Sequence, residues 1–334
     1  MKLYQLLKLN QKLKSRTIKL LGILAANILG FRHLSVRIDP VLACNLACRM
    51  CYFSSPEKRK ELKIKGSLTE QEIESIAKVL FPKAFQVFIG CGAEPTLSKH
   101  FIKLAELAKQ YNVPDIGIVS NGLLMSFEDI ESLVKLNINE IALSLHGVSK
   151  DVYEKFMVNG EYEKFIERLN WFNEIKKKNN ESQTQLRINF TVNSENLNDL
   201  HHFFDVFGNY PISTLQIRPV MDIGGQYSES IKVDQEQQYN TLIEKFKEIS
   251  KNKGLRLLAN TIDTGFKKEN KNGAIADAVY CYISNYTATY LGFKWCDITF
   301  NEFMRRKRWR STVIKSIFNR KASIDNKNAK YEVL

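Results

Sequence analysis

Three features that define other classes of protein are missing from this sequence of 334 residues. No apolar run is long enough to cross a bilayer, since the longest, residues 20–31, is short and contains Asn27 and two glycines. No dinucleotide-binding fingerprint follows the first predicted strand. No secretory signal accompanies the six cysteines, so we expect a reducing, cytoplasmic setting in which disulfides do not form.

Acidic residues are nearly missing from the two ends of the chain. Residues 1–37 carry eight Lys and Arg and no acidic residue. Residues 301–321 also carry eight Lys and Arg, and their one acidic residue is Glu302. These two segments account for the whole net charge of +13, so the basicity says little about a substrate bound in the middle. With 44% hydrophobic residues, the chain can bury one barrel-sized domain and a smaller appendage.

A basic amphipathic helix is predicted within residues 1–32. One side holds Leu3, Leu6, Leu7, Ile18, Leu21 and Leu24, and the other holds Lys8, Lys12, Arg16 and Lys19. Such a helix either lies in the plane of an anionic membrane surface or packs on the protein itself, and the sequence leaves both readings open. The basic tail, residues 301–334, could contact lipid, nucleic acid or solvent. Nucleic acid ranks lowest, because no nucleic-acid-binding fold is recognisable.

Between the two ends, short apolar segments alternate with segments of helical periodicity. The predicted strands are residues 34–38, 85–89, 116–119, 140–145, 186–192 and 215–220. The predicted helices are residues 69–79, where Thr69 and Glu72 form a capping box, 99–110, 127–135, 161–177 and 195–207. This alternation predicts a partial parallel (β/α)6 TIM-type barrel over residues 33–225, with an open doubly wound sheet as the alternative.

Polar and glycine-containing sequences follow most of the predicted strands. They are a cysteine loop after the first strand and residues 90–95, 120–122, 144–147 and 218–219 after later ones. In parallel barrels the working residues collect at the carboxyl ends of the strands. This coincidence favours the barrel over the open sheet.

The cysteine loop holds Cys44, Cys48 and Cys51 at C-x-x-x-C-x-x-C spacing. Three thiolates on one loop can hold a cubane iron–sulfur cluster and leave its fourth iron open to a ligand that is not protein. A structural zinc site needs four protein ligands, and no Cys or His pair nearby completes one. A partial zinc site or three idle cysteines are therefore the weaker alternatives.

The order of these motifs resembles the radical S-adenosylmethionine (SAM) superfamily over residues 33–220. The resemblance implies that Cys44, Cys48 and Cys51 hold a 4Fe-4S cluster whose fourth iron is chelated by SAM. It also implies reductive cleavage of SAM to a 5′-deoxyadenosyl radical that abstracts hydrogen from a substrate. A flavodoxin- or ferredoxin-type electron donor is the implied partner.

The same resemblance implies a set of SAM contacts. The amino group is expected near Gly90, Gly92 and Glu94, the ribose near Ser120 and Asn121, the carboxylate near Ser144 and Lys155, and the adenine near Met50 and Tyr52. Asn189 and Arg218 are expected to line the site, although both could equally be satisfied barrel polars.

A small α+β cap is predicted over residues 226–300, with a helix over 239–250 and a loop or lid over 260–277. Cys281 and Cys296 flank a predicted hairpin that resembles half of a SPASM/twitch-like region. They either bind a second cluster or are two ordinary buried cysteines. The substrate is a peptide or protein, or else a lipid-linked or small molecule.

The alternative is that the chain is a non-catalytic iron–sulfur protein, which uses its cluster to sense redox state and docks through its basic ends. Such a sensor would have no need of Glu94, the Ser-Asn-Gly turn or Ser144. The expected location is the cytoplasm, with peripheral contact at the inner face of the membrane if the amino-terminal helix binds lipid.

Overall fold

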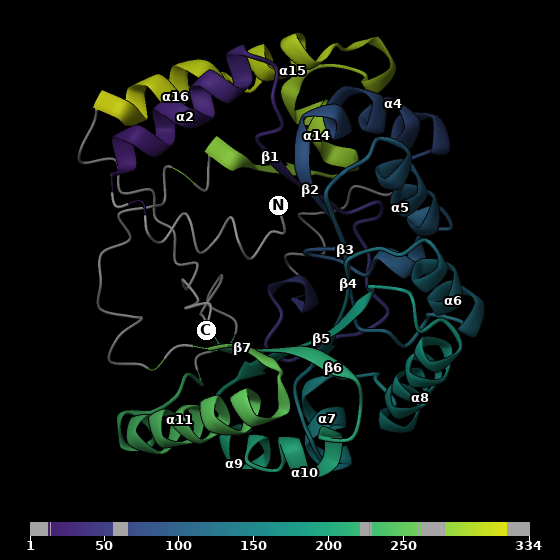
Figure 1. The fold of residues 1–334 in the computed structure, drawn as a ribbon, viewed down its shortest axis with the longest axis vertical. Helices are drawn as coiled ribbons and strands as arrows, with labels where there is room; N and C mark the ends of the chain where they lie inside the picture. The colour runs from purple at the N-terminus through teal and green to yellow at the C-terminus, as the bar shows by residue number, and fades with distance from the viewer. Residues whose placement is uncertain are drawn as a thin grey trace. The chain divides into compact units, whose positions relative to one another are not determined.

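The structure, a computed structural model, describes residues 13, 15–55, 66–220, 227, 229–259, 261, 275 and 278–318 (Figure 1). The predicted helix before Leu13, most of the predicted 260–277 loop and the basic tail after Phe318 lie outside these residues. Two compact units share the chain. One comprises residues 1–42, 64–118 and 269–327, and the other comprises residues 43–63, 119–268 and 328–334. The predicted domain boundaries at residues 32, 225 and 300 stay predictions.

The strands of the first unit are parallel and follow the order β3-β2-β1-β8. Their bounds are Leu34–Ile38 (β1), Ala84–Ile89 (β2), Asp115–Ser120 (β3, whose last two residues belong to the second unit) and Tyr280–Ile283 (β8). The register aligns Val36 with both Val87 and Cys281. Strand β8 therefore adds a segment from near the end of the chain to the first strand.

The strands of the second unit are parallel as well and follow the order β7-β6-β5-β4. Their bounds are Glu140–Leu145 (β4), Gln185–Val192 (β5), Ile212–Pro219 (β6) and Arg256–Leu258 (β7). The sheet order β7-β6-β5-β4-β3-β2-β1-β8 confirms the predicted parallel α/β class. Strands β7 and β8 extend the six predicted strands, and both are too short for a clear periodic signal.

Helices precede, connect or follow these strands. In the first unit they are α2 (Arg16–Ile28), α4 (Glu70–Leu80), α5 (Phe101–Gln110), α14 (Asn285–Leu291), α15 (Phe300–Arg306) and α16 (Trp309–Phe318), with short 3-10 turns η2 (Phe81–Lys83), η3 (Pro95–Leu97) and η5 (Trp295–Asp297). In the second unit they are α6 (Phe127–Lys135), α7 (Lys150–Phe156), α8 (Tyr162–Lys178), α9 (Leu197–Leu200), α10 (Phe203–Phe207) and α11 (Glu236–Lys253), with the turns η1 (Tyr52–Ser54) and η4 (Val233–Gln235).

The helix starts follow from their capping residues. Thr69 and Glu72 exchange both capping hydrogen bonds at the start of α4, which confirms the predicted box. The helix predicted over residues 195–207 is instead two short helices, α9 and α10. It begins later than predicted because the Asn193 side chain accepts the backbone N–H groups of Glu195 and Asn196 and holds them in a turn.

Each group of strands has one apolar face and one polar face. In the first unit Val36, Ile38, Val87 and Ile89 are fully buried in the core. The alternate positions in that unit include Ser35, Arg37, Gln86 and Asp115, whose side chains hydrogen-bond to one another. Parallel strands packed on both faces usually carry apolar residues throughout. The polar faces therefore mark the side of each strand group on which chemistry is expected.

The region after β8 differs from the predicted hairpin. Residues 285–291 form helix α14, which begins after Ser284, so Cys281 and Cys296 do not lie on two strands of one hairpin. Cys281 is buried on the apolar face of β8, whereas Cys296 is exposed, so the alternative of two buried cysteines is wrong for Cys296. No helix within the described residues is long and apolar enough to cross a membrane.

Candidate functional site

The cysteine loop leaves β1 and belongs to the second unit. Its thiols Cys44, Cys48 and Cys51 are all half-buried and all free of disulfides. The backbone N–H of Leu46 lies 3.4 Å from the Cys44 Sγ, and the Cys51 N–H donates to the Cys48 carbonyl at 3.0 Å. The Leu46 N–H, aimed at the Cys44 sulfur, stabilises negative charge on it, as a thiolate ligand of a cluster requires.

The loop is fastened to the second unit at several points. The Ala47 and Arg49 N–H groups donate to the carbonyls of Val158 and Phe156, each at 2.9 Å. The Asn121 side chain donates to the Asn45 side chain at 2.8 Å. Leu46 is 1% exposed and anchors the loop in the core. The thiols are thus held on a fixed backbone.

Three free thiols on one loop are the donor set that the predicted cluster requires. Within the described part of the chain, no three His, Cys, Asp or Glu side chains converge tightly enough to bind one metal ion. A cluster distributes its thiolate ligands over several irons and so needs a wider cage than a single zinc ion does. Three thiols on one fastened loop match that demand, and Cys44, Cys48 and Cys51 are the residues that would hold the cluster.

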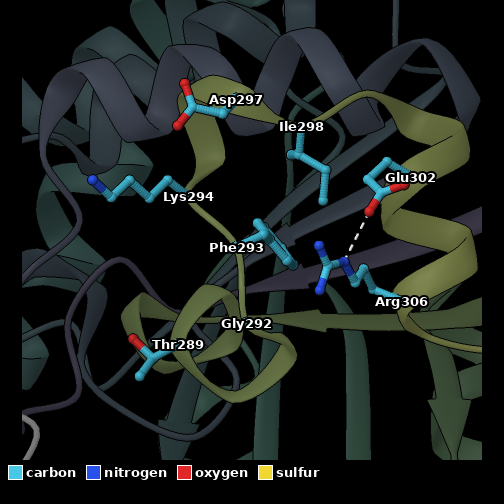
Figure 2. Close-up of a pocket in the computed structure, with 8 residues that line it drawn as sticks. All are labelled: Thr289, Gly292, Phe293, Lys294, Asp297, Ile298, Glu302 and Arg306. Atoms are coloured by element: carbon cyan, nitrogen blue, oxygen red, sulfur yellow. Dashed lines mark hydrogen bonds and ion pairs between the residues drawn. The ribbon is translucent and has the colours of Figure 1, made fainter.

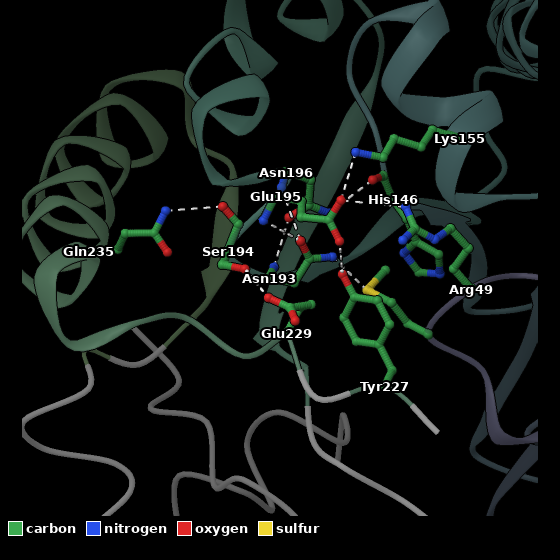
Figure 3. A network of polar contacts seen from close by, with 11 residues as sticks. Arg49, His146, Lys155, Asn193, Ser194, Glu195, Asn196, Tyr227, Glu229 and Gln235 are labelled. Atoms are coloured by element: carbon green, nitrogen blue, oxygen red, sulfur yellow. Dashed lines mark hydrogen bonds and ion pairs between the residues drawn. The ribbon is translucent and has the colours of Figure 1, made fainter. Parts of the chain in front are cut away.

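A turn after β5 holds the loop from another side (Figure 3). The Asn193 Nδ2 lies 2.8 Å from the Met50 Sδ. The Asn193 backbone N–H donates to the Asn196 Oδ1 at 2.7 Å, and the Asn196 Nδ2 donates to the carbonyls of His146 and Thr191, each at 3.0 Å. The residue next to the third cysteine is therefore positioned by the end of β5.

Glu195, in the same turn, gathers three partners from distant parts of the second unit. Its carboxylate lies 2.7 Å from the Lys155 Nζ and 3.5 Å from the Arg49 Nη1, and it accepts the Tyr227 hydroxyl at 3.0 Å (Figure 3). The hydrogen bond from Lys155 is the main reason why the pKa of Glu195 lies below its usual range. Lys155, predicted to meet the SAM carboxylate, is thus paired with a protein carboxylate here.

His146 lies at the end of β4 and is neutral at physiological pH. Burial, with a smaller contribution from nearby Arg218, lowers its pKa to about 4. The Thr191 N–H approaches the His146 Nδ1 at 3.3 Å, so this nitrogen accepts and the proton of the neutral ring belongs on Nε2. A proton on the His146 Nδ1 would make this nitrogen a donor that faces the Thr191 N–H, which is also a donor.

Acid is therefore expected to destabilise the fold through His146. Between pH 6.5 and pH 4 the unfolded chain binds a proton at this ring and the folded chain does not, so the free energy of unfolding falls as the pH falls. The loss should reach about 3 kcal/mol across that window. Urea unfolding at several pH values should show a shallower pH dependence for His146→Gln than for the wild-type chain. Parallel curves for the two proteins would contradict this assignment.

In the first unit, Asp39 organises the segment that follows β2. Its carboxylate accepts the backbone N–H of Cys91 at 2.7 Å, that of Gly92 at 3.0 Å and the hydroxyl of Tyr282 at 2.7 Å. Burial raises the pKa of Asp39, and these hydrogen bonds oppose the rise. Gly90 has φ of +80°, a left-handed conformation that favours glycine and turns the chain toward Asp39.

Glu94 lies in the same segment and is 2% exposed. Its Oε1 accepts the hydroxyl of Thr96 at 2.7 Å and the Thr96 N–H at 3.3 Å, so the side chain caps the turn η3. Ser120 and Asn121 are buried too, and their side chains accept the N–H groups of Gly122 and Leu123 in a tight turn. The assignment of these residues to SAM stays a prediction.

Ser144 and Asn189 are brought together by the register of β4 and β5. Asn189 accepts from the Arg187 Nε at 2.7 Å, and Arg187 forms an ion pair with Glu140 at 3.1 Å and a hydrogen bond with Gln216. All of these residues lie on the polar face of the second unit. Of the Tyr52 side chain nothing is described, whereas Arg218 is exposed at the end of β6.

Several residues that build the site were not predicted. Asp39 directly follows β1, and Asn193, Glu195 and Asn196 follow β5, so all four obey the strand-end rule that identified the other motifs. Applying that rule to every strand would have found them. Asn45 and Tyr282 carry no such signal, since only the folded chain brings them to their partners.

A separate hollow of about 650 Å³ lies in the first unit after β8, and none of the predicted site residues lines it (Figure 2). It is lined by Thr289, Gly292, Phe293, Lys294, Asp297, Ile298, Glu302 and Arg306. Glu302 and Arg306, one turn apart on α15, form an ion pair at 2.8 Å along one wall of it. Two acids balance two basic side chains here, so the hollow has no pronounced preference for a charged ligand.

Comparison with protein families gives one match, to the model described as the Radical SAM superfamily, over residues 38–205. Among curated proteins, the probable GTP 3′,8-cyclase of Methanocaldococcus jannaschii is 30% identical over 167 residues, which are 50% of this chain and 52% of that protein. The probable GTP 3′,8-cyclase of Saccharolobus solfataricus is 25% identical over 190 residues, 57% of this chain and 58% of that protein. The chain thus spans little more than half the length of these relatives.

Solved structures share the fold. The native anSMEcpe structure with bound AdoMet has a TM-score of 0.61 at 18% identity, over 85% of this chain and 83% of that one. Streptococcus suis SuiB bound to S-adenosylmethionine has a TM-score of 0.57 at 17% identity, over 76% of this chain and 58% of that one.

Proposed function

The chain belongs to the radical SAM superfamily, and from this premise we propose that it abstracts hydrogen from an anionic polar substrate. When bound, the 4Fe-4S cluster and SAM supply the electron transfer and the 5′-deoxyadenosyl radical for that step. The observation that carries the proposal is the fastened loop with Cys44, Cys48 and Cys51. A cluster that must reduce a sulfonium needs thiolate ligands, and three half-buried cysteines on one anchored loop support this assignment.

The chain's own residues would bind and orient SAM. We assign its amino group to the segment of Gly90, Gly92 and Glu94 and its carboxylate to Ser144 and Lys155. Lys155 forms an ion pair with Glu195 at 2.7 Å, so a SAM carboxylate would bind Lys155 either together with Glu195 or in its place. Met50, fixed by Asn193, would offer a polarisable thioether to the adenine.

The polar face of the second unit supports an anionic substrate. Three arginines lie on this face, namely Arg187, Arg218 and Arg256. Glu140 lies on it too and forms an ion pair with Arg187. Guanidinium groups suit phosphate and carboxylate. The curated relatives are named for a reaction of GTP, so a nucleoside triphosphate is the first probe. Peptides and lipid-linked molecules are the further probes, because the sequence favours neither class.

We propose two interactions in addition. A flavodoxin- or ferredoxin-type protein would deliver the electron, since the cluster must be reduced in every turnover. The amino-terminal helix would hold the enzyme at the inner face of a membrane in the cytoplasm.

Anaerobic reconstitution with iron and sulfide tests the chemistry. The loaded protein, given dithionite and SAM, is expected to form 5′-deoxyadenosine, and the right substrate should increase its rate and transfer deuterium into it. A fully loaded cluster that yields no 5′-deoxyadenosine would favour the non-catalytic alternative. GTP, precursor peptides and lipid-linked sugars can be compared in the same assay.

A further inference from the structure

Helix α2 has two apolar faces instead of one. Leu20 and Asn27 are buried on the inner face, where Asn27 contacts His33 at 3.1 Å. Ile18, Leu21 and Ile28 lie on the opposite face, three and seven residues apart, and are 56%, 49% and 64% exposed. The outward face of a surface helix is normally polar. An uncharged, apolar outward face on such a helix is typical of a surface that binds another protein or a membrane.

Helix α16 lies beside α2 and runs antiparallel to it (Figure 1). The Arg16 Nη2 donates to the Ser316 carbonyl at 2.9 Å, and the Arg310 Nε donates to the Asn27 Oδ1 at 3.1 Å. Trp309 and Val313 bury the inner face of α16, whereas Phe318 is 81% exposed. Both helices belong to the first unit, so this pair is a fixed part of it.

The exposed apolar side chains of α2, of the residues just after it and of α16 form what we call the α2–α16 surface. Its members are Ile18, Leu21, Ile28, Leu29, Phe31, Ile314 and Phe318. With Leu13, they make up eight of the sixteen large apolar side chains that are exposed among the described residues. That concentration on two short helices and the residues flanking α2 is unlike the scattered single residues of an ordinary protein surface.

Positive charge accompanies this surface. No acid occurs in residues 13–38, and α15 and α16 carry Glu302 as their one acid, which Arg305 and Arg306 already engage. Arg308, Arg310 and Lys315 are exposed on or next to α16. A second copy of the chain docked on this surface would bring these like charges together, which disfavours it as the occupant. Anionic lipid headgroups would instead neutralise them.

We propose that the α2–α16 surface docks on an anionic membrane, with its apolar side chains inserted at the headgroup boundary and its basic side chains against the headgroups. The inference builds on the membrane contact proposed above and is independent of the radical chemistry. It adds a carboxy-terminal helix to that contact. It also places the contact on Ile18, Leu21 and Ile28 of α2, within the described residues.

Sedimentation with sucrose-loaded vesicles of phosphatidylcholine, with and without phosphatidylglycerol, tests the proposal on the full chain. The wild-type protein should bind the anionic vesicles, and binding should weaken with salt. The triple variant I18Q/L21Q/I28Q should bind at least about tenfold more weakly. The variant R308Q/K315Q should lose roughly fivefold for each charge and most of the salt dependence. Arg310 is left intact because it bridges the two helices.

The control variant V206Q/V233Q replaces two exposed apolar side chains of the second unit, at 42% and 85% exposure, and should bind like the wild type. Formation of 5′-deoxyadenosine should be equal in all four proteins, which separates this test from that of the chemistry. Equal vesicle binding by the triple variant would overturn the proposal. So would a wild-type chain that ignores anionic vesicles, whether it is monomeric or forms a dimer that the triple variant abolishes.

Discussion

Cys48→Ala is expected to abolish the cluster and the reaction together. Cys48 supplies one of three thiolates on a single loop, and two thiolates leave a second iron without a protein ligand. Iron bound after reconstitution should fall close to zero. The rate of 5′-deoxyadenosine formation should fall by about a thousandfold or more, because no step of SAM cleavage proceeds without the cluster. Iron analysis, the absorbance of the cluster and product chromatography measure these effects.

Cys296→Ala and Cys281→Ala are the matched controls for this experiment. Cys296 is exposed, and Cys281 is buried among apolar side chains, where burial raises the pKa of its thiol. Both variants should keep the iron content of the wild-type protein. Loss of iron in either one would instead support a second cluster in the C-terminal region. Circular dichroism should confirm that Cys48→Ala is folded, since the loop's backbone hydrogen bonds do not use its thiol.

Asp39→Ala is expected to cost about 2–4 kcal/mol of stability. The variant removes a buried carboxylate that accepts three groups, and it leaves the Cys91 and Gly92 N–H groups without that acceptor. Because these groups shape the segment of Gly90 and Gly92, the KM for SAM should rise at least about tenfold under our assignment of that segment. Chemical unfolding and SAM titrations of the reconstituted enzyme measure the two effects separately.

Asp39→Asn should have an intermediate effect. Its amide oxygen, at the Oδ1 position, can still accept from Cys91 and Gly92, whereas its amide nitrogen, at the Oδ2 position, can accept neither from Gly92 nor from the Tyr282 hydroxyl. It should fall between the wild type and Asp39→Ala in both measurements. Asp205→Ala controls for the loss of an ordinary surface carboxylate, since Asp205 has a side chain that is 78% exposed. A stable Asp39→Ala variant with an unchanged KM for SAM would remove Asp39 from the site.

The sequence predicts the core of the fold because local and global signals agree there. All six predicted strands are present within a few residues of their expected ends, and Thr69 starts α4 as its capping box requires. Strand β8 escaped prediction for a physical reason. Its four residues alternate in burial, and what makes them a strand is the pairing with β1, which the local sequence does not encode.

The candidate site is predictable to the extent that its residues stand at strand ends. The cysteine loop, Gly90, Ser120 and Ser144 are found in this way. The partners that hold them are a different matter. Glu195 contacts Lys155 and Arg49, which lie far from it in the sequence. No local sequence pattern predicts which carboxylate forms an ion pair with a given lysine.

The two-sided character of α2 shows the same limit in another form. A helical wheel separates apolar from basic residues, and it predicted one apolar face with Ile18, Leu21 and Leu24 together. The inner face is defined instead by what covers it, namely α16 and the core around Leu20. Only the packed structure tells which of the apolar residues remain exposed.

The pairing of β8 with β1 has a consequence for anyone who trims this protein. Four residue pairs join the two strands, and the Asp39 N–H donates to the Ile283 carbonyl at 2.9 Å. A fragment that stops before Tyr280 would leave the row of N–H and C=O groups along β1 bare, and an unprotected strand edge recruits other chains. It would also lose the Tyr282 hydroxyl from Asp39. Aggregation of such a fragment would thus reflect a missing neighbour strand and give no information about whether the cysteine loop can fold.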